Sequence, residues 1–434
     1  MQVVFVILLS IILGYVILKK RKFDWYTIAV FSAFIYYYPC LLGNINFKNG
    51  HENISWEVYM CVALYLLVLF LFMLFNDHYV IVTFNNRSSI SSYNSKVNSG
   101  NSRPIYQETA TNYAVVCIEL IALLLLVYTF VKYGGFKLSF NKAQMLAITD
   151  RFTEYLKYIA LFSFVYGGVN NGKGIFIVRL LSALLIGYTF LLGHRSFVVI
   201  GIIAIFMNYV STEIRMRFIM VVKKYKWVFL FMFLAAFFFL FVKNVFAAFM
   251  AGNYELVKSR LTNSEYYIES LLNSESNVIV SNLQRVCVSD MHYSVFDYLL
   301  SIIRLIPFMG GNLSSLFGYE SFSKKLNMEF NSRYDEGIGL GSTYLGEAYA
   351  IGGGIAIIII LVITFCFFTW MMKKRNRCKT GVGYTFISIM LSYFAFYIHR
   401  NSLDFLLITG RSYMYIWILI LIFRCVLKGT LIKE

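Results

Sequence analysis

Charged side chains are scarce in this chain: Asp, Glu, Lys and Arg make up 14% of its 434 residues, against 59% hydrophobic residues. Soluble domains carry about 25% charged residues. This scarcity, together with a mean hydropathy of +0.67, excludes an ordinary soluble protein. The formal net charge is nevertheless +17. Because the Lys and Arg residues lie mainly in short clusters between apolar segments, they indicate membrane topology and anionic lipid rather than a nucleic-acid partner.

The sequence also lacks the motifs of metal sites and disulfides. Its seven cysteines form no C-x-x-C pair and follow no metal-ligand spacing, and Cys287 is the one that falls in a region we expect outside the cytoplasm. No D-x-D or E-x-D motif occurs either. We therefore expect no disulfide, no metal site and no cofactor.

Apolar segments long enough to span a bilayer, which takes about 20 residues, recur along the chain. We expect about eleven transmembrane segments, all of them helices, because only helices and closed barrels satisfy their backbone hydrogen bonds in lipid. They cover residues 3–18, 25–42, 56–75, 113–131, 158–169, 175–192, 197–210, 227–242, 348–371, 383–397 and 412–427. The fold class is therefore an all-α polytopic membrane protein.

The orientation follows from the positive-inside rule. The cluster at residues 19–22 sets the first loop inside, and with eleven spans the dense clusters at 215–226 and 373–379 fall on the same side. The first segment has no basic residues before it and no small-residue cleavage site, so it is expected to be a retained span. These patterns predict a bacterial inner-membrane protein with a periplasmic N-terminus and a cytoplasmic C-terminus.

Three parts of the chain are expected on this topology. Residues 1–245 are expected to form an N-terminal bundle of about eight helices, with a Ser/Asn-rich cytoplasmic linker at 84–104. Residues 246–346 are expected to form a large periplasmic loop, and residues 347–434 the C-terminal transmembrane helices. Loops beyond about 15 residues are usually functional or disordered. We expect this loop to be docked and to contain short helices, with residues 295–309 apolar enough to lie in the interface or re-enter the bilayer.

Several arginines lie at the outer ends of the predicted helices or in the large loop, where the positive-inside rule does not require them. Guanidinium groups bind phosphate oxygens bidentately and stay charged, so they suit a lipid pyrophosphate. The alternative is that they reach lipid headgroups or pair with carboxylates such as Asp404. The candidate pyrophosphate-binding residues are Arg195, Arg285, Arg304, Arg400 and Arg411, with His194 and His399 as neighbours.

Glu347 is the first candidate for a catalytic base, because it is a carboxylate at the mouth of a predicted membrane helix. It could equally be the ion-pair partner of an arginine. His292, near Asp290 in the large loop, is a second candidate. The glycines at 352–354 allow close approach of the backbone to an anion, but small residues in membrane helices more often serve helix packing.

The chain resembles the Wzy-type O-antigen polymerases in its layout of about eleven helices with a large loop near the C-terminal third. It also resembles them in Tyr133-Gly134-Gly135, in Gly193-His194-Arg195-Ser196, and in the stretch from Gly341-Ser342 through Gly346-Glu347 to Gly353. The resemblance implies a GT-C-like, inverting, metal-independent membrane glycosyltransferase. It would transfer a growing glycan from undecaprenyl pyrophosphate to the next lipid-linked repeat unit. Its implied partners are that lipid-linked oligosaccharide as donor and acceptor, membrane lipid, and a polysaccharide chain-length regulator.

The sequence is also compatible with three other functions. An O-antigen ligase would use the same donor and the same loop plan. A flippase for lipid-linked oligosaccharides predicts internal repeats and intramembrane charges along a path, and neither pattern is evident. A non-catalytic scaffold or chain-length regulator would leave the set of arginines unexplained.

Overall fold

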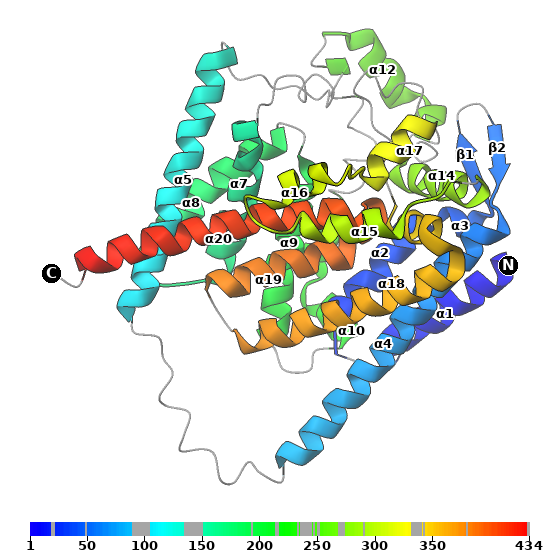
Figure 1. Cartoon of the computed structure of the whole chain (residues 1–434), viewed down its shortest axis with the longest axis horizontal. Helices are drawn as coiled ribbons and strands as arrows, with labels where there is room; N and C mark the ends of the chain where they lie inside the picture. Colours follow the sequence, from blue (N-terminus) through cyan, green and yellow to red (C-terminus); the bar gives the residue numbers. More distant parts are fainter. Residues whose placement is uncertain are drawn as a thin grey trace.

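The computed structural model describes residues 1–18, 22–47, 50–88, 105–133, 151–191, 194–212, 217–231, 252–267, 274–289, 291–330, 343–378 and 381–431, with positions 234, 245, 248, 249 and 341. Its secondary structure is helical apart from one antiparallel hairpin, β1 (Asn44–Phe47) and β2 (Gly50–Asn53). The two termini lie at opposite ends of the long axis (Figure 1).

Five helices of the described part are long and apolar enough to cross a membrane. They are Trp56–His78 of α4 (Trp56–Ser88), Glu108–Lys132 of α5 (Ile105–Tyr133), α18 (Tyr344–Arg377), Val382–Arg400 and Leu403–Lys428 of α20 (Leu403–Leu431). The stretch Val382–Arg400 joins α19 (Val382–Ser392) to a π-helical turn η2 (Tyr393–Tyr397) and a 3₁₀ turn η3 (Ile398–Arg400). The chain is thus an all-α membrane protein.

Shorter helices complete the bundle. Four are apolar: α1 (Gln2–Leu18), α2 (Trp25–Tyr37), α8 (Ile175–Leu191) and α9 (Arg195–Thr212). With them are α3 (Pro39–Leu42), α7 (Arg151–Val169) and α10 (Phe218–Lys224). The count of eleven spans and the GT-C-like arrangement stay predictions, since most of the expected span 227–242 and of the linker 84–104 lies outside the described residues.

Helix α18 is broken near its start. Gly352 leaves the helical conformation, and Gly353 has φ 62° and ψ −147°, a backbone region that is open almost only to glycine. The glycine motif therefore separates a short first segment, which carries Glu347, from residues 354–377. At about 1.5 Å per residue those 24 residues span about 36 Å, enough for a hydrocarbon core of about 30 Å.

The long segment between the two groups of membrane helices contains α12 (Tyr254–Thr262), α14 (Glu275–Val288), α15 (Val295–Ile303), α16 (Gly310–Leu316) and α17 (Phe322–Phe330). Helix α14 contacts α2, α4 and α18 and buries Ile279 and Leu283. The described part of the expected loop therefore contains short helices, and α14 is docked on the bundle. Gln284 of α14 also hydrogen-bonds to the backbone of Asn53 and Ser55, which fixes the β1–β2 hairpin, an element the sequence did not predict.

The basic clusters meet at one end of the bundle. Lys22 pairs with Arg217 in an isolated β-bridge, and the Arg375 guanidinium lies over the Trp25 ring at 5.5 Å. Asp24, Trp25 and Asn76 lie at the same end, because Asn76 donates to the Asp24 carboxylate at 3.5 Å. Since α4 starts beside α14 and reaches this end at Asn76, the basic end lies opposite to the start of α18 (Figure 1).

Candidate functional site

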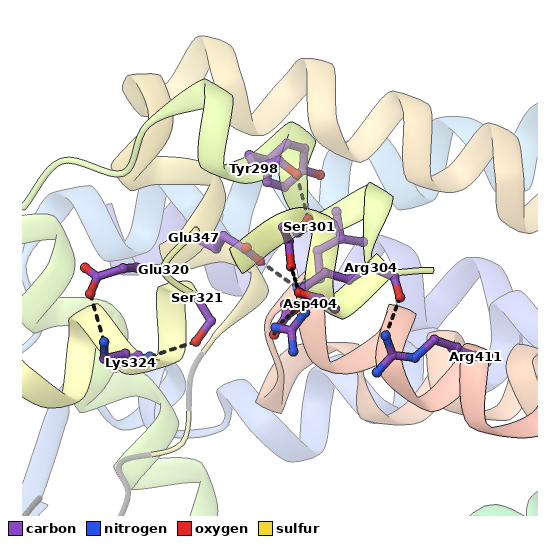
Figure 2. Close-up of polar contacts among 12 residues, drawn as sticks. Tyr298, Ser301, Arg304, Glu320, Ser321, Lys324, Glu347, Asp404 and Arg411 are labelled. Atoms are coloured by element: carbon purple, nitrogen blue, oxygen red, sulfur yellow. Dashed lines mark hydrogen bonds and ion pairs between the residues drawn. The ribbon is translucent and has the colours of Figure 1, made fainter. Parts of the chain in front are cut away.

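The side chains of Glu347, Asp404 and Arg304 lie close together where α18 and α20 begin beside α15, and Arg411, farther along α20, is bonded to the backbone of Arg304 (Figure 2). We call Glu347, Asp404, Arg304 and Arg411 the Glu347 cluster. Glu347 lies in the first turn of α18, which begins at Thr343; the Thr343 hydroxyl accepts a hydrogen bond from the backbone N–H of Gly346 at 2.8 Å. A threonine at this position satisfies one of the free N–H groups of a helix start. The cap thereby fixes the orientation of the turn that carries Glu347.

The Glu347 carboxylate is fully buried, with 0% of the residue exposed. Its Oε2 accepts a hydrogen bond from the Leu403 backbone N–H at 2.7 Å, so it caps the start of α20, where the helix dipole favours negative charge. Its Oε1 has no hydrogen-bond partner among the described residues. One carboxylate oxygen therefore holds the two helix starts together, and the other remains available as an acceptor.

Arg304 and Asp404 form an ion pair beside this carboxylate. Nη1 of Arg304 donates to both carboxylate oxygens of Asp404 at 2.8 Å, and the guanidinium lies 5.2 Å from the centre of the Tyr319 ring. Tyr319 lies outside the membrane-spanning helices, and burial and nearby Asp404 raise the pKa of its hydroxyl well above the usual value.

Arg411 completes the cluster. Its Nη1 donates to the backbone carbonyl of Arg304 at 2.9 Å. The Nε atoms of Arg304 and Arg411 are buried and have no hydrogen-bond partner among the described residues. A buried donor without a partner costs about 1–3 kcal/mol, and more when it is charged. Arg304 and Arg411 therefore each retain one donor that is suited to an anionic ligand.

A second group surrounds η2 and η3. Arg400 forms an ion pair with Glu275 of α14, and its guanidinium lies 5.3 Å from the centre of the Tyr397 ring. His399 is buried, with Nδ1 3.3 Å from the Tyr37 hydroxyl and Nε2 3.4 Å from the Tyr65 hydroxyl. The imidazole is thus enclosed by tyrosines, while Arg400 points to the side of α14. Such π-helical turns are frequent at functional sites.

Helix α9 begins next to this second group. Its first residue is Arg195, and the preceding His194 ring lies 5.9 Å from Phe197, whose ring lies 6.4 Å from Tyr393 in η2. The sequence motif around Arg195 is therefore placed beside η2. Gly193 lies outside the described residues.

The remaining predicted residues are not brought into the Glu347 cluster. Arg285 on α14 and His292 before α15 are exposed, and no contact between them and the cluster occurs among the described residues. Asp290 lies outside the described residues. The roles of Arg285, His292 and Asp290 therefore stay predictions without structural support.

The structure adds partners that the sequence did not single out. Tyr319 lies against Arg304, and Glu275 pairs with Arg400. Their acidic or aromatic nature was visible in the sequence, but nothing in its spacing connected them with arginines 15 to about 125 residues away. Within the described residues no three His, Cys, Asp or Glu side chains come together as a metal-ligand set.

The fold and the site define the class of this chain: a helical membrane protein with a buried cluster of carboxylates and arginines where two membrane helices begin. No protein-family model, no curated protein and no solved structure matches it.

Proposed function

We propose that this protein is a membrane glycosyltransferase that polymerises lipid-linked repeat units of O-antigen or a similar surface polysaccharide. One observation carries the proposal: the buried carboxylate of Glu347, which lies close to the Arg304–Asp404 ion pair, keeps one oxygen without a partner among the described residues, and the Nε donors of Arg304 and Arg411 likewise have none. A base beside a binding site for phosphate oxygens is what transfer from a sugar pyrophosphate requires.

In the proposed reaction, a hydroxyl of the incoming repeat unit attacks the anomeric carbon of the growing glycan. The bond from that carbon to the phosphate oxygen breaks, and its electron pair leaves with undecaprenyl pyrophosphate. The hydroxyl proton passes to Oε1 of Glu347. In-line attack inverts the anomeric centre. Arg304 and Arg411 stabilise the charge that develops on the leaving pyrophosphate, so no acid is required for its departure.

The broken start of α18 supports this assignment. In membrane proteins, helix segments interrupted at glycines often form substrate sites, because the freed backbone groups line a cavity. Here the carbonyl of Ala350, just before the break, accepts a hydrogen bond from the Tyr293 N–H at 2.9 Å. The break is thereby fixed by the long segment that also supplies Arg304. The long segment therefore contacts the start of α18, which carries Glu347, and also contains Arg304.

The test uses Glu347→Gln, which keeps the size of the side chain and the acceptor for Leu403 N–H but removes the base. In a strain whose only copy carries the variant, polysaccharide polymer should disappear and single repeat units should remain on the lipid core. Loss of a general base reduces rates by about 10²–10⁴-fold. Gel analysis of extracted lipopolysaccharide measures the outcome.

The matched control is Glu255→Gln on the exposed surface of α12, which should leave polymer lengths unchanged. Both variants should insert in the membrane in wild-type amounts. Wild-type polymer in Glu347→Gln cells would refute the assignment. Lipid-linked polymer that accumulates without transfer to the lipid core would instead identify an O-antigen ligase.

A further inference from the structure

The apolar stretch within the long segment forms a helical hairpin that lies along α20. It comprises α15, a turn at residues 304–309, and α16, and we call residues 295–317 the α15–α16 hairpin. Helix α15 contacts α20, and Figure 1 shows α15 and α16 beside α20, whereas α12 and α17 lie farther from it. The hairpin is therefore packed on a helix that is itself long enough to cross the membrane.

Contacts along α20 show how far the hairpin reaches. Arg304 meets Asp404 in the first turn of α20, Leu305 packs against Gly410, and the Phe308 N–H donates to the Tyr415 hydroxyl at 2.8 Å. From Leu403 to Tyr415 the helix rises about 18 Å at about 1.5 Å per residue. Half of a hydrocarbon core is about 15 Å. The tip of the hairpin is thus level with the middle of the α20 span.

The tip is a sharp turn fixed by these contacts. Phe308 has φ 65°, a left-handed conformation that is rare for an aromatic residue, and it follows Pro307. Such conformations persist only where the surroundings determine them. The hydrogen bond to Tyr415 and the packing of the Phe308 ring 4.8 Å from the Tyr415 ring supply that constraint. The turn is consequently part of the folded structure.

The outer face of the hairpin is apolar and exposed. Phe308 is 76% exposed and Leu316 80%. The other large exposed apolar side chains are Val295, Phe296, Leu299, Ile302, Ile306, Met309 and Phe317. A contiguous face of this kind is unusual on a surface in water and marks a contact with a membrane or a partner.

Both charged residues of the hairpin are turned away from this face and are paired. Asp297 accepts from Lys325 of α17 at 2.8 Å, and Arg304 binds Asp404. By contrast, two other helices of the long segment expose charged side chains: α12 exposes Glu255 and Lys258, and α17 exposes Lys324. The hairpin therefore lacks the exposed charged side chains that α12 and α17 carry, so its surface is suited to hydrocarbon and theirs to water.

We propose that the α15–α16 hairpin is a re-entrant membrane element whose exposed face binds the hydrocarbon chains of the surrounding bilayer. The depth of the Phe308–Tyr415 contact and the absence of exposed charge on the hairpin carry this inference. It places Arg304 and Arg411 below the membrane surface, with the exposed apolar face of the hairpin toward the lipid. The inference is independent of the function proposed for Glu347.

The test measures the membrane depth of spin labels on purified full-length protein in phospholipid vesicles. Ser315 of the hairpin and Ser259 of α12 are both exposed serines, so Ser315→Cys and Ser259→Cys are a matched pair with little change of volume. Cysteines at 117, 366, 378 and 425, which are exposed or half-buried, are first replaced by alanine. Power saturation compares collisions with oxygen, which concentrates in hydrocarbon, and with a water-soluble nickel chelate.

The Ser315→Cys label should collide severalfold more with oxygen than with the nickel chelate, like a reference label at Ile363 on the exposed face of α18. The Ser259→Cys label should show the opposite preference. Phe308→Cys provides a second position at the tip. Nickel accessibility of the 315 and 308 labels equal to that of the 259 label would overturn the proposal, even if Glu347→Gln abolishes polymer.

Discussion

Charged side chains at the helix ends of this protein have partners of different kinds. Oε2 of Glu347 is bound by a backbone N–H, Arg304 by Asp404, and Arg400 by Glu275. Pairing offsets the cost of placing a charge near hydrocarbon, so an arginine at a helix end does not by itself indicate a ligand. The atoms that remain without partners are more informative, and in this cluster they are Glu347 Oε1 and the two arginine Nε atoms.

Arg195→Ala and Arg400→Ala are each expected to abolish polymer while the protein still inserts normally. Loss of a charged hydrogen bond to pyrophosphate costs about 1.5–3 kcal/mol, or about 10–100-fold in rate. The double variant should be no worse than either single one if the residues act as a unit. Polymer lengths on gels and the amount of protein in the membrane fraction measure both effects.

The ion pair of Arg400 provides a control for this prediction. Glu275→Gln removes the partner of Arg400 but leaves the guanidinium in place. If Arg400 binds substrate, Glu275→Gln should retain polymer. Equal loss in Arg400→Ala and Glu275→Gln would show that the ion pair, and not a bound pyrophosphate, is what the protein requires from Arg400.

At the scale of elements, interruptions of regular helix coincide with the two groups of candidate site residues. The break in α18 follows Glu347 by about one turn, and η3, which directly follows η2, contains His399 and ends at Arg400. Each interruption changes the path of the backbone within a few residues of a candidate site residue. The candidate site residues therefore lie at helix ends and interruptions, and the continuous helices hold those ends in place.

Gly353→Ala should destabilise the protein by about 1–3 kcal/mol, because alanine is strained at φ 62° and ψ −147°. Gly383→Ala in α19 is the matched control: a Cβ there meets no atom within 4 Å, and alanine favours the helix. Thermal unfolding in detergent compares the two. A Gly353→Ala protein as stable as Gly383→Ala would mean that the break in α18 is absent.

The docking of α14 on α4 brings two cysteines together. The sulfurs of Cys61 and Cys287 are 3.8 Å apart, and both cysteines are free. A disulfide needs about 2.05 Å between sulfurs, so a small shift of the two side chains is sufficient. Treatment with a disulfide-forming oxidant should therefore cross-link α4 to α14.

Mass spectrometry of proteolytic fragments measures this cross-link, and Cys61→Ser should eliminate it. Cys366 and Cys425 serve as a comparison, because both are exposed and lie on different helices. No cross-linked 366–425 fragment should form. Absence of the 61–287 fragment under conditions that oxidise exposed cysteines would contradict the packing of α14 against α4.

At the scale of the whole molecule, opposite ends of the bundle have different charge. The end with Lys22, Arg217 and Arg375 is basic, and the end with the Glu347 cluster combines acidic and basic groups. This separation agrees with the positive-inside rule, under which the basic end faces the cytoplasm. A periplasmic N-terminus and a cytoplasmic C-terminus stay a prediction of that rule.

A reporter fused after residue 260 in α12 should be active only as a periplasmic enzyme, such as alkaline phosphatase, and inactive as a cytoplasmic one. A fluorescent protein that folds only in the cytoplasm should fluoresce at the C-terminus. Cytoplasmic reporter activity at residue 260 would show that the orientation is the reverse of the predicted one. The Glu347 cluster would then lie on the cytoplasmic face, where the proposed periplasmic reaction could not occur.

The sequence alone determined the class of the protein, because hydropathy and charge clusters are local properties. It predicted apolar helices, the short helices of the long segment, and Glu347 at a helix mouth. It also predicted an apolar stretch at 295–309 that could re-enter the bilayer. Gly353 is likewise visible in sequence as part of a glycine run, although its left-handed backbone is not.

Only the tertiary structure decided which of these residues meet. It paired Arg304 with Asp404 and Arg400 with Glu275, enclosed His399 between Tyr37 and Tyr65, and left His292 exposed. These contacts join residues about 100 or more positions apart, so no local pattern of spacing encodes them. They arise because each helix must bury one face against another, and that packing fixes which helix ends share a site.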